Sequence, residues 1–99
     1  MAERIRFLVT YDIRHPRRLK RVHDVVVDHG ERLQYSVYVC DLTRQEMVAL
    51  RAALRKVMHL DEDHVAIFDL GPPQGRASRR VEHLGRAPKI PDEDEPAIW

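Results

Sequence analysis

Asp12 is the residue whose type and position most clearly suggest chemistry. It lies at the end of an apolar strand, and basic residues follow it: Arg14, Arg17, Arg18, Lys20 and Arg21. Carboxylates are ligands for hard divalent cations, and guanidinium groups bind phosphate without regard to base sequence. This combination favours nucleic acid handled through a divalent ion. Two simpler interpretations stay open: Asp12 caps the turn into a helix, and the basic residues form a solvated helix face.

Other residue types that often carry catalysis give weaker indications. The six histidines include no pair at i, i+4 and no His-x-His pair, which argues against a zinc site. His15 lies near Asp12, either as a proton donor or as a turn residue ahead of Pro16. Cys40 is the only cysteine, so no disulfide is expected, and its apolar strand favours a small core residue over a nucleophile.

The composition describes a basic body with an acidic tail. The 99 residues suffice for one domain, and the net charge is only +1. Residues 92–95 hold four of the sixteen acidic groups, so residues 1–91 carry 17 basic and 12 acidic groups. With no signal pattern and no long apolar run, we expect a soluble, cytoplasmic protein without a membrane segment.

Two elements must position Asp12 and the cations. Residues 5–13 alternate as a strand, which places Leu8, Thr10 and Asp12 on the face opposite Ile5, Phe7, Val9, Tyr11 and Ile13. A helix is predicted from Pro16 to Gly30, with Gly30 as a left-handed terminator. Its buried stripe comprises Leu19, Val22 and Val26.

The remaining elements complete a repeated pattern. Residues 32–42 alternate as one bent strand or two short ones. Thr43 and Glu46 then predict a capping box, followed by a helix to about Met58 and a strand over residues 65–70. The buried stripe expected for this helix comprises Met47, Leu50, Leu54 and Val57.

The order β-α-β-(β)-α-β predicts a ferredoxin-like βαββαβ sandwich of the α/β (α+β) class over residues 1–70. Residues 71–99 are expected to form a linker, an edge strand at 80–84 and an acidic tail, and to dock on a dimer mate or another partner. The edge strand is expected to extend the sheet of the other protomer. Two helices cover only one sheet face. The other would expose Leu8, Cys40, Phe68 or Leu70, so we predict a two-fold homodimer through the open face.

Such a dimer would change the chemistry of Asp12. If Asp12 faces the two-fold axis, each chain contributes a carboxylate and a metal ion could lie between them. The expected cofactor is Mg²⁺, or Mn²⁺, held weakly and able to activate water or orient a phosphodiester.

The motifs resemble the CRISPR-associated protein 2 family. The resemblance rests on Tyr11-Asp12-Ile13, on Arg18 and on the segment from His29 to Cys40, and it continues through the strand from Asp63 to Leu70. It implies a ferredoxin-like homodimer that acts with the CRISPR-associated integrase (protein 1) in capturing foreign DNA as spacers. It also implies metal-dependent endonuclease activity on RNA or double-stranded DNA.

The resemblance suggests roles for four residues. Asp12 is similar to the family's metal-ligand aspartate, Arg18 and Arg32 to its phosphate-facing arginines, and Ser36 to the serine of its Gln-x-Ser segment. The chain departs from the family at His15-Pro16, where members usually carry further acidic or polar residues, and this departure weakens the expectation of strong metal binding.

These inferences favour a subunit that binds double-stranded DNA during spacer acquisition, with nuclease activity on DNA or single-stranded RNA as a secondary property. The expected nucleic-acid-binding residues are Arg14, Arg17, Arg18, Arg21, Arg32 and Ser36, and the expected catalytic and metal-binding residue is Asp12. Two alternatives stay open: a free-standing Mg²⁺-dependent ribonuclease of toxin type, and a regulatory ferredoxin-like domain that binds a small molecule. A CRISPR array beside the gene would separate the first interpretation from both.

Overall fold

A computed structural model describes residues 3–88 as four strands and three helices. In chain order these are β1 (Ile5–Asp12), α1 (Pro16–Val27), β2 (Glu31–Gln34), β3 (Val37–Leu42), α2 (Arg44–Val57), β4 (His64–Gly71) and α3 (Arg76–Arg80). The stretch predicted as one or two strands is therefore two, joined by a turn at Tyr35 and Ser36.

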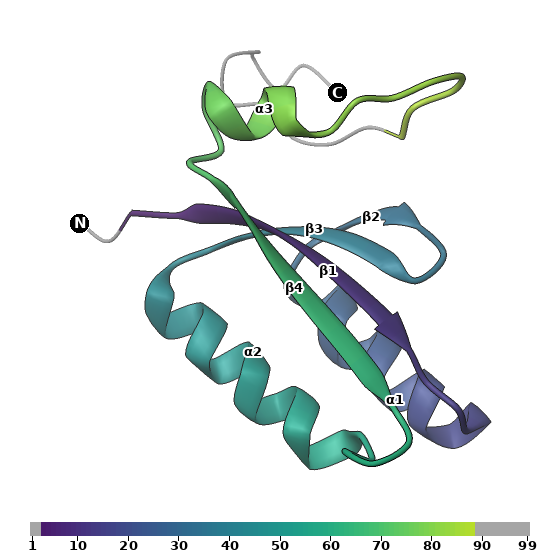
Figure 1. The fold of residues 1–99 in the computed structure, drawn as a ribbon. Coiled ribbons are helices and arrows are strands. Elements are labelled where there is room, and N and C mark those ends of the chain that lie inside the picture. Colours follow the sequence, from purple (N-terminus) through teal and green to yellow (C-terminus); the bar gives the residue numbers. More distant parts are fainter. Residues whose placement is uncertain (1–2, 89–99) are drawn as a thin grey trace.

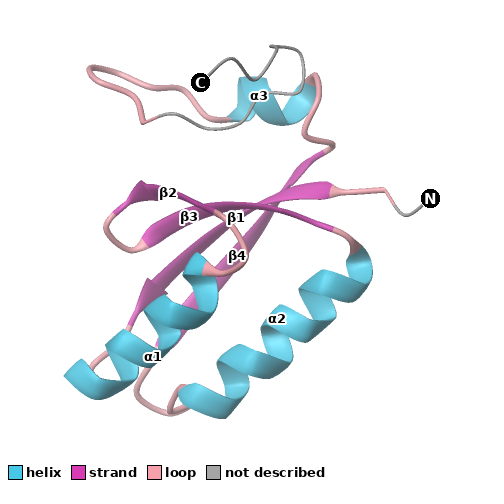
Figure 2. Ribbon diagram, turned by 180° about the vertical axis from the view of Figure 1, so that it is seen from behind, coloured by secondary structure: helices cyan, strands magenta, loops and turns pink. Residues whose placement is uncertain are grey.

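The strands form one antiparallel sheet in the order β2-β3-β1-β4. Helices α1 and α2 lie side by side on one face of this sheet (Figure 1). The view from behind shows the same two layers (Figure 2). The ferredoxin-like βαββαβ arrangement expected from the sequence is confirmed for this part of the chain. None of its helices is long and apolar enough to cross a membrane.

The core lies between the sheet and the two helices. Val9 and Tyr11 of β1 are buried there, as the alternation predicts. Cys40 is also buried in this core, because it lies opposite Phe7 in the β1–β3 register. The expectation that Cys40 lies on the open face is therefore wrong, although its assignment as a small core residue is confirmed.

The open face carries part of the apolar surface that the sequence predicts. Phe68 of β4 lies directly opposite Leu8 of β1, on the face away from α1 and α2. Phe68 is 51% exposed, which is unusual for a phenylalanine in a sheet. This side of the sheet is the surface on which the predicted dimer depends.

Local capping signals set the helix ends. α1 begins at Pro16, as predicted, and His15 is its N-cap, accepting a hydrogen bond at Nδ1 from the Arg17 backbone N–H (3.1 Å). In α2 both hydrogen bonds of the Thr43–Glu46 capping box are formed. Each cap satisfies backbone N–H groups that have no partner inside the helix.

Gly30 has a different function from the one predicted. α1 ends at Val27 with Asp28 as its C-cap, and Gly30 does not have a positive φ. A Cβ atom at Gly30 would collide with the Val39 carbonyl oxygen and the Cys40 Sγ. The glycine permits close approach of the α1–β2 connection to β3 and does not terminate the helix.

The predicted edge strand at 80–84 requires the sheet of a second protomer, so it stays a prediction in this single chain. Residues 76–80 form the short helix α3, and residues 81–88 contain no strand. α3 lies on the side of the sheet away from α1 and α2 (Figure 1), and its Ala77 is buried. A strand needs a partner edge for its backbone hydrogen bonds, and residues 80–84 have none within the single chain. The acidic segment 92–95 and Trp99 lie outside the described residues.

Candidate nucleic-acid interface

Asp12 is the last residue of β1, on the same face as Leu8 and Thr10. Its side chain is 66% exposed, and its Oδ2 lies 3.6 Å from Nη2 of Arg14. The backbone N–H of Arg14 donates to Asp63 (3.0 Å), and the cap of α1 is His15. Because Asp12 caps neither the turn nor the helix, the simpler interpretation of this residue is wrong.

The residue that faces Asp12 across the sheet is His64. The two are direct partners in the β1–β4 register, at the start of β4, and side chains in such positions lie on the same face within contact range. Sequence reasoning considered His15 instead, whose Nδ1 is engaged in the helix cap. No sequence signal pointed to His64, because register is a property of strand pairing.

A buried carboxylate, Asp63, joins the loop before β4 to the start of α1. Its side chain is fully buried and accepts from Nε of Arg18 (2.7 Å) and from the backbone N–H groups of Arg14 (3.0 Å) and His59 (2.8 Å). The hydrogen bond from Arg18, with these amides, holds the pKa of Asp63 far below its usual range. Sequence reasoning did not single out this aspartate.

Arg18 therefore has a structural partner. Its guanidinium pairs with Asp63 and with Glu62 (3.0 Å), and its side chain is only 21% exposed. The side-chain hydrogen bond to Asp63 raises the pKa of Arg18 above its ordinary value. In this structure Arg18 holds the β1–α1 turn against the α2–β4 loop. Contact between Arg18 and phosphate stays a prediction.

The other predicted cations lie at the surface. Arg14, Arg17 and Arg21 are exposed, on the turn after β1 and on α1. Arg32 of β2 is exposed, and its Cζ lies 5.2 Å from the ring centroid of Tyr35. Ser36 is half-buried in the β2–β3 turn, and its carbonyl accepts the backbone N–H of Tyr11 (3.1 Å). This hydrogen bond places the turn beside the end of β1 that carries Asp12.

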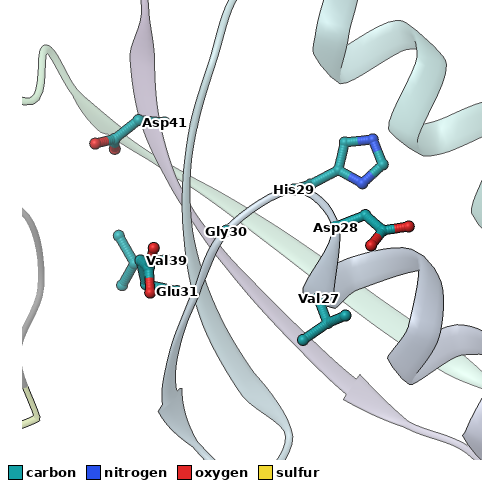
Figure 3. Close-up of a pocket in the computed structure, with 7 residues that line it drawn as sticks. All are labelled: Val27, Asp28, His29, Gly30, Glu31, Val39 and Asp41. Carbon is teal, nitrogen blue, oxygen red and sulfur yellow. The ribbon is translucent and has the colours of Figure 1, made fainter.

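A separate pocket of about 360 Å³ lies where the α1–β2 connection meets β3. Its acidic groups are Asp28, Glu31 and Asp41. Figure 3 shows Asp41 and Glu31 on one side of the connection, and Asp28 with His29 on the other. The side chains diverge, so this pocket is not built as a cation site.

The donors within one chain do not complete a metal site. Among the residues that the structure describes, no group of three or more His, Cys, Asp and Glu side chains is placed to hold an ion. Asp12 offers a single exposed carboxylate, and Asp63 is occupied by Arg18 and two amides. One carboxylate matches the few protein ligands that Mg²⁺ uses at sites completed by phosphate and water.

The sequence of this chain is similar to those of one family of known proteins. A family model described as CRISPR associated protein Cas2 matches residues 5–77. The "CRISPR-associated endoribonuclease Cas2" of Geobacter sulfurreducens is 36% identical over 80 residues, which are 81% of this chain and 83% of the relative. The "CRISPR-associated endonuclease Cas2" of Halalkalibacterium halodurans is 29% identical over 97 residues, 93% of this chain and 97% of the relative.

The fold of this chain is also similar to solved structures. The crystal structure of Streptococcus pyogenes Cas2 matches with a TM-score of 0.68 and 35% identity, and covers 81% of this chain and 99% of its own. A hypothetical protein from Thermus thermophilus, TT1823, matches with a TM-score of 0.74 and 30% identity, and covers 89% of this chain and 99% of its own.

Proposed function

The chain belongs to the CRISPR associated protein Cas2 family, and we propose that it is a nucleic-acid-binding subunit of the machinery that captures foreign DNA as new spacers. In this proposal it binds duplex DNA together with the CRISPR-associated integrase. Metal-dependent nuclease activity is a secondary property, suggested by relatives named endoribonuclease and endonuclease. The observation that carries the proposal is the exposed Asp12 carboxylate beside exposed arginines at one end of the sheet.

The arginines at this end of the sheet account for sequence-independent binding. Arg14, Arg17 and Arg21 are exposed and lie on one continuous segment, the β1–α1 turn and α1. Guanidinium groups on a rigid helix fix the register of a phosphate backbone without reading bases. The Asp63–Arg18 pair supports this binding indirectly, because it anchors the turn from which the segment starts.

A dimer through the open sheet face would bring two copies of Asp12 together. Phe68 and Leu8 supply apolar surface on this face, and Asp12 lies on it at the end of the same strand as Leu8. Two Asp12 carboxylates and substrate phosphate would hold Mg²⁺ or Mn²⁺. When bound, such an ion activates water and offsets phosphate charge.

Replacement of Asp12 by asparagine tests the nuclease part. Asp12→Asn removes the anionic ligand at nearly constant shape, so metal-dependent cleavage of RNA and DNA should fall to background. DNA binding should persist, because the carboxylate that is removed repels phosphate. Cleavage is measured on labelled RNA and duplex DNA in Mg²⁺ and Mn²⁺ titrations, with the isosteric Asp61→Asn at an exposed loop position as the control.

Two results would contradict parts of the proposal. Cleavage by Asp12→Asn at the native rate would show that Asp12 is not the metal ligand. Failure of the native protein to bind duplex DNA, alone or with the integrase, would remove the spacer-acquisition function itself.

A further inference from the structure

A second pocket, of about 310 Å³, opens between α1 and the β2–β3 turn. It is lined by Tyr11, Pro16, Leu19, Lys20, His23, Arg32 and Tyr35. Its volume is near the lower limit of small-molecule sites, which span roughly 300–1,000 Å³. A double helix cannot enter such a space, whereas a single nucleotide can.

The charges around this pocket favour an anion. Lys20 and Arg32 are its basic residues, and no carboxylate is among the lining residues. Lys20 pairs with Asp24, whose Oδ2 lies 3.3 Å from its Nζ on the exposed surface of α1. A phosphate that binds Lys20 and Arg32 would therefore meet no buried negative charge.

The pocket also offers an aromatic platform. Tyr35 is 69% exposed, and the guanidinium of Arg32 lies over its ring. Bases in single-stranded nucleic acid stack on aromatic rings and on arginine planes, with cations nearby for the phosphate. An exposed tyrosine and a paired arginine at the mouth of a cationic pocket match this mode of binding.

Polar side chains of Tyr11 and His23 form one wall of the pocket. The hydroxyl of Tyr11 lies 3.0 Å from Nδ1 of His23, and that of Tyr38 lies 3.4 Å from the same atom. Burial raises the pKa of Tyr11 to about 12, so its hydroxyl keeps its proton. The wall therefore adds no negative charge to a site that would hold a phosphate.

The position of the pocket connects it to the proposed nucleic-acid site. Tyr11 lines the pocket, and the next residue, Asp12, points to the opposite face of the sheet. The Tyr11 backbone N–H bonds to Ser36, so the turn that carries Tyr35 adjoins this end of β1. A nucleic-acid strand bound near Asp12 would have this pocket within its reach.

We propose that the pocket between α1 and the β2–β3 turn binds one unpaired nucleotide unit, with its base on Tyr35 and Arg32 and its phosphate on Lys20 and Arg32. The inference rests on the proposed function, since it adds recognition of a single-stranded end to duplex binding. The same chemistry would accept a free nucleoside monophosphate.

The test uses fluorescence anisotropy to compare the affinity of the full-length protein for DNA duplexes that differ in their ends. The probes are a blunt duplex, the same duplex with a short single-stranded extension at its 5′ or 3′ ends, and adenosine 5′-monophosphate as a competitor. The native protein should bind an extended duplex at least about five-fold more tightly than the blunt one, the lower limit for one base–aromatic stack. If adenosine 5′-monophosphate displaces the extended duplex, a single nucleotide is sufficient for binding to the pocket. If the extended duplex is preferred but the mononucleotide does not compete, the ligand is the single-stranded end of a longer strand.

Variants locate the effect. Tyr35→Ala and Lys20→Ala should abolish the preference for extended over blunt DNA, while Tyr35→Phe, which keeps the ring, should retain it. Arg55→Ala, at an exposed position of α2, controls for the loss of one basic side chain. Equal binding of both duplexes by the native protein, or an undiminished preference in Tyr35→Ala, would overturn the inference. Binding of neither duplex would instead count against the proposed function.

Discussion

At the scale of single residues, the buried Asp63 connects the segments that meet at the candidate interface. It joins Arg18 of α1, the backbone of the β1–α1 turn and the backbone of the α2–β4 loop through one carboxylate. A buried carboxylate with these partners is stabilising only while it is ionised, because its acceptor positions serve a guanidinium and two N–H groups.

This arrangement predicts a pH-dependent stability. The folded-state pKa of Asp63 is lowered by Arg18 and the two amides, so its contribution is fully present above the unfolded-state pKa, about 3.9, and disappears as the pH falls below it. Asp63→Asn should lower the urea midpoint at pH 7, and the difference from the native protein should shrink as the pH falls from 5 toward 2. The exposed Asp61→Asn serves as the control. A difference that does not change with pH would show that the ionised carboxylate is not the stabilising form.

At the scale of elements, α1 both supports the fold and presents the proposed binding surface. Val22 and Val26 are buried against the sheet, while Arg17 and Arg21 remain exposed. Arg18 belongs to the supporting part through its bond to Asp63. Substitution of all the arginines of α1 together would therefore mix a loss of binding with a loss of stability.

A cleaner test leaves Arg18 in place. For duplex DNA, the slope of log K against log salt changes by about 0.9 for each phosphate that the protein no longer neutralises. Arg14→Ala, Arg17→Ala and Arg21→Ala combined should thus flatten the slope by up to about three such steps, measured by anisotropy with unlabelled competitor. The matched control removes three exposed cations from α2, Arg51, Arg55 and Lys56. Equal slopes for the two triple variants would exclude α1 as the binding surface.

At the scale of the whole molecule, the sheet has helices α1 and α2 on one face, and among residues 3–88 the other face has the short helix α3 on its side (Figure 1). Arg6 and Asp41 pair through two hydrogen bonds (2.8 and 2.9 Å) on this second face, and Arg6 is buried. Phe68 and Asp12 lie on the same face and are exposed. The proposed dimer would use this exposed part of the face.

A charged substitution tests that dimer. Phe68→Asp places a carboxylate where two copies would meet, so the native protein should sediment as a dimer and the variant as a monomer at micromolar concentration. Its fold should be kept, because the side chain is exposed in the single chain. Val48→Asp, at a 57% exposed position of α2 on the helix side, is the matched control. Dissociation by Val48→Asp with a stable Phe68→Asp dimer would place the interface on the helices.

The sequence by itself determined what depends on neighbours along the chain. Alternation assigned the faces of β1, Pro16 marked the start of α1, and Thr43 with Glu46 marked that of α2, since pleating and capping involve residues only a few positions apart. Only the tertiary structure decided the contacts between distant segments. The Arg18–Asp63 pair, the Asp12–His64 register and the close approach at Gly30 each join separate elements, and no local pattern specifies which residues will meet there.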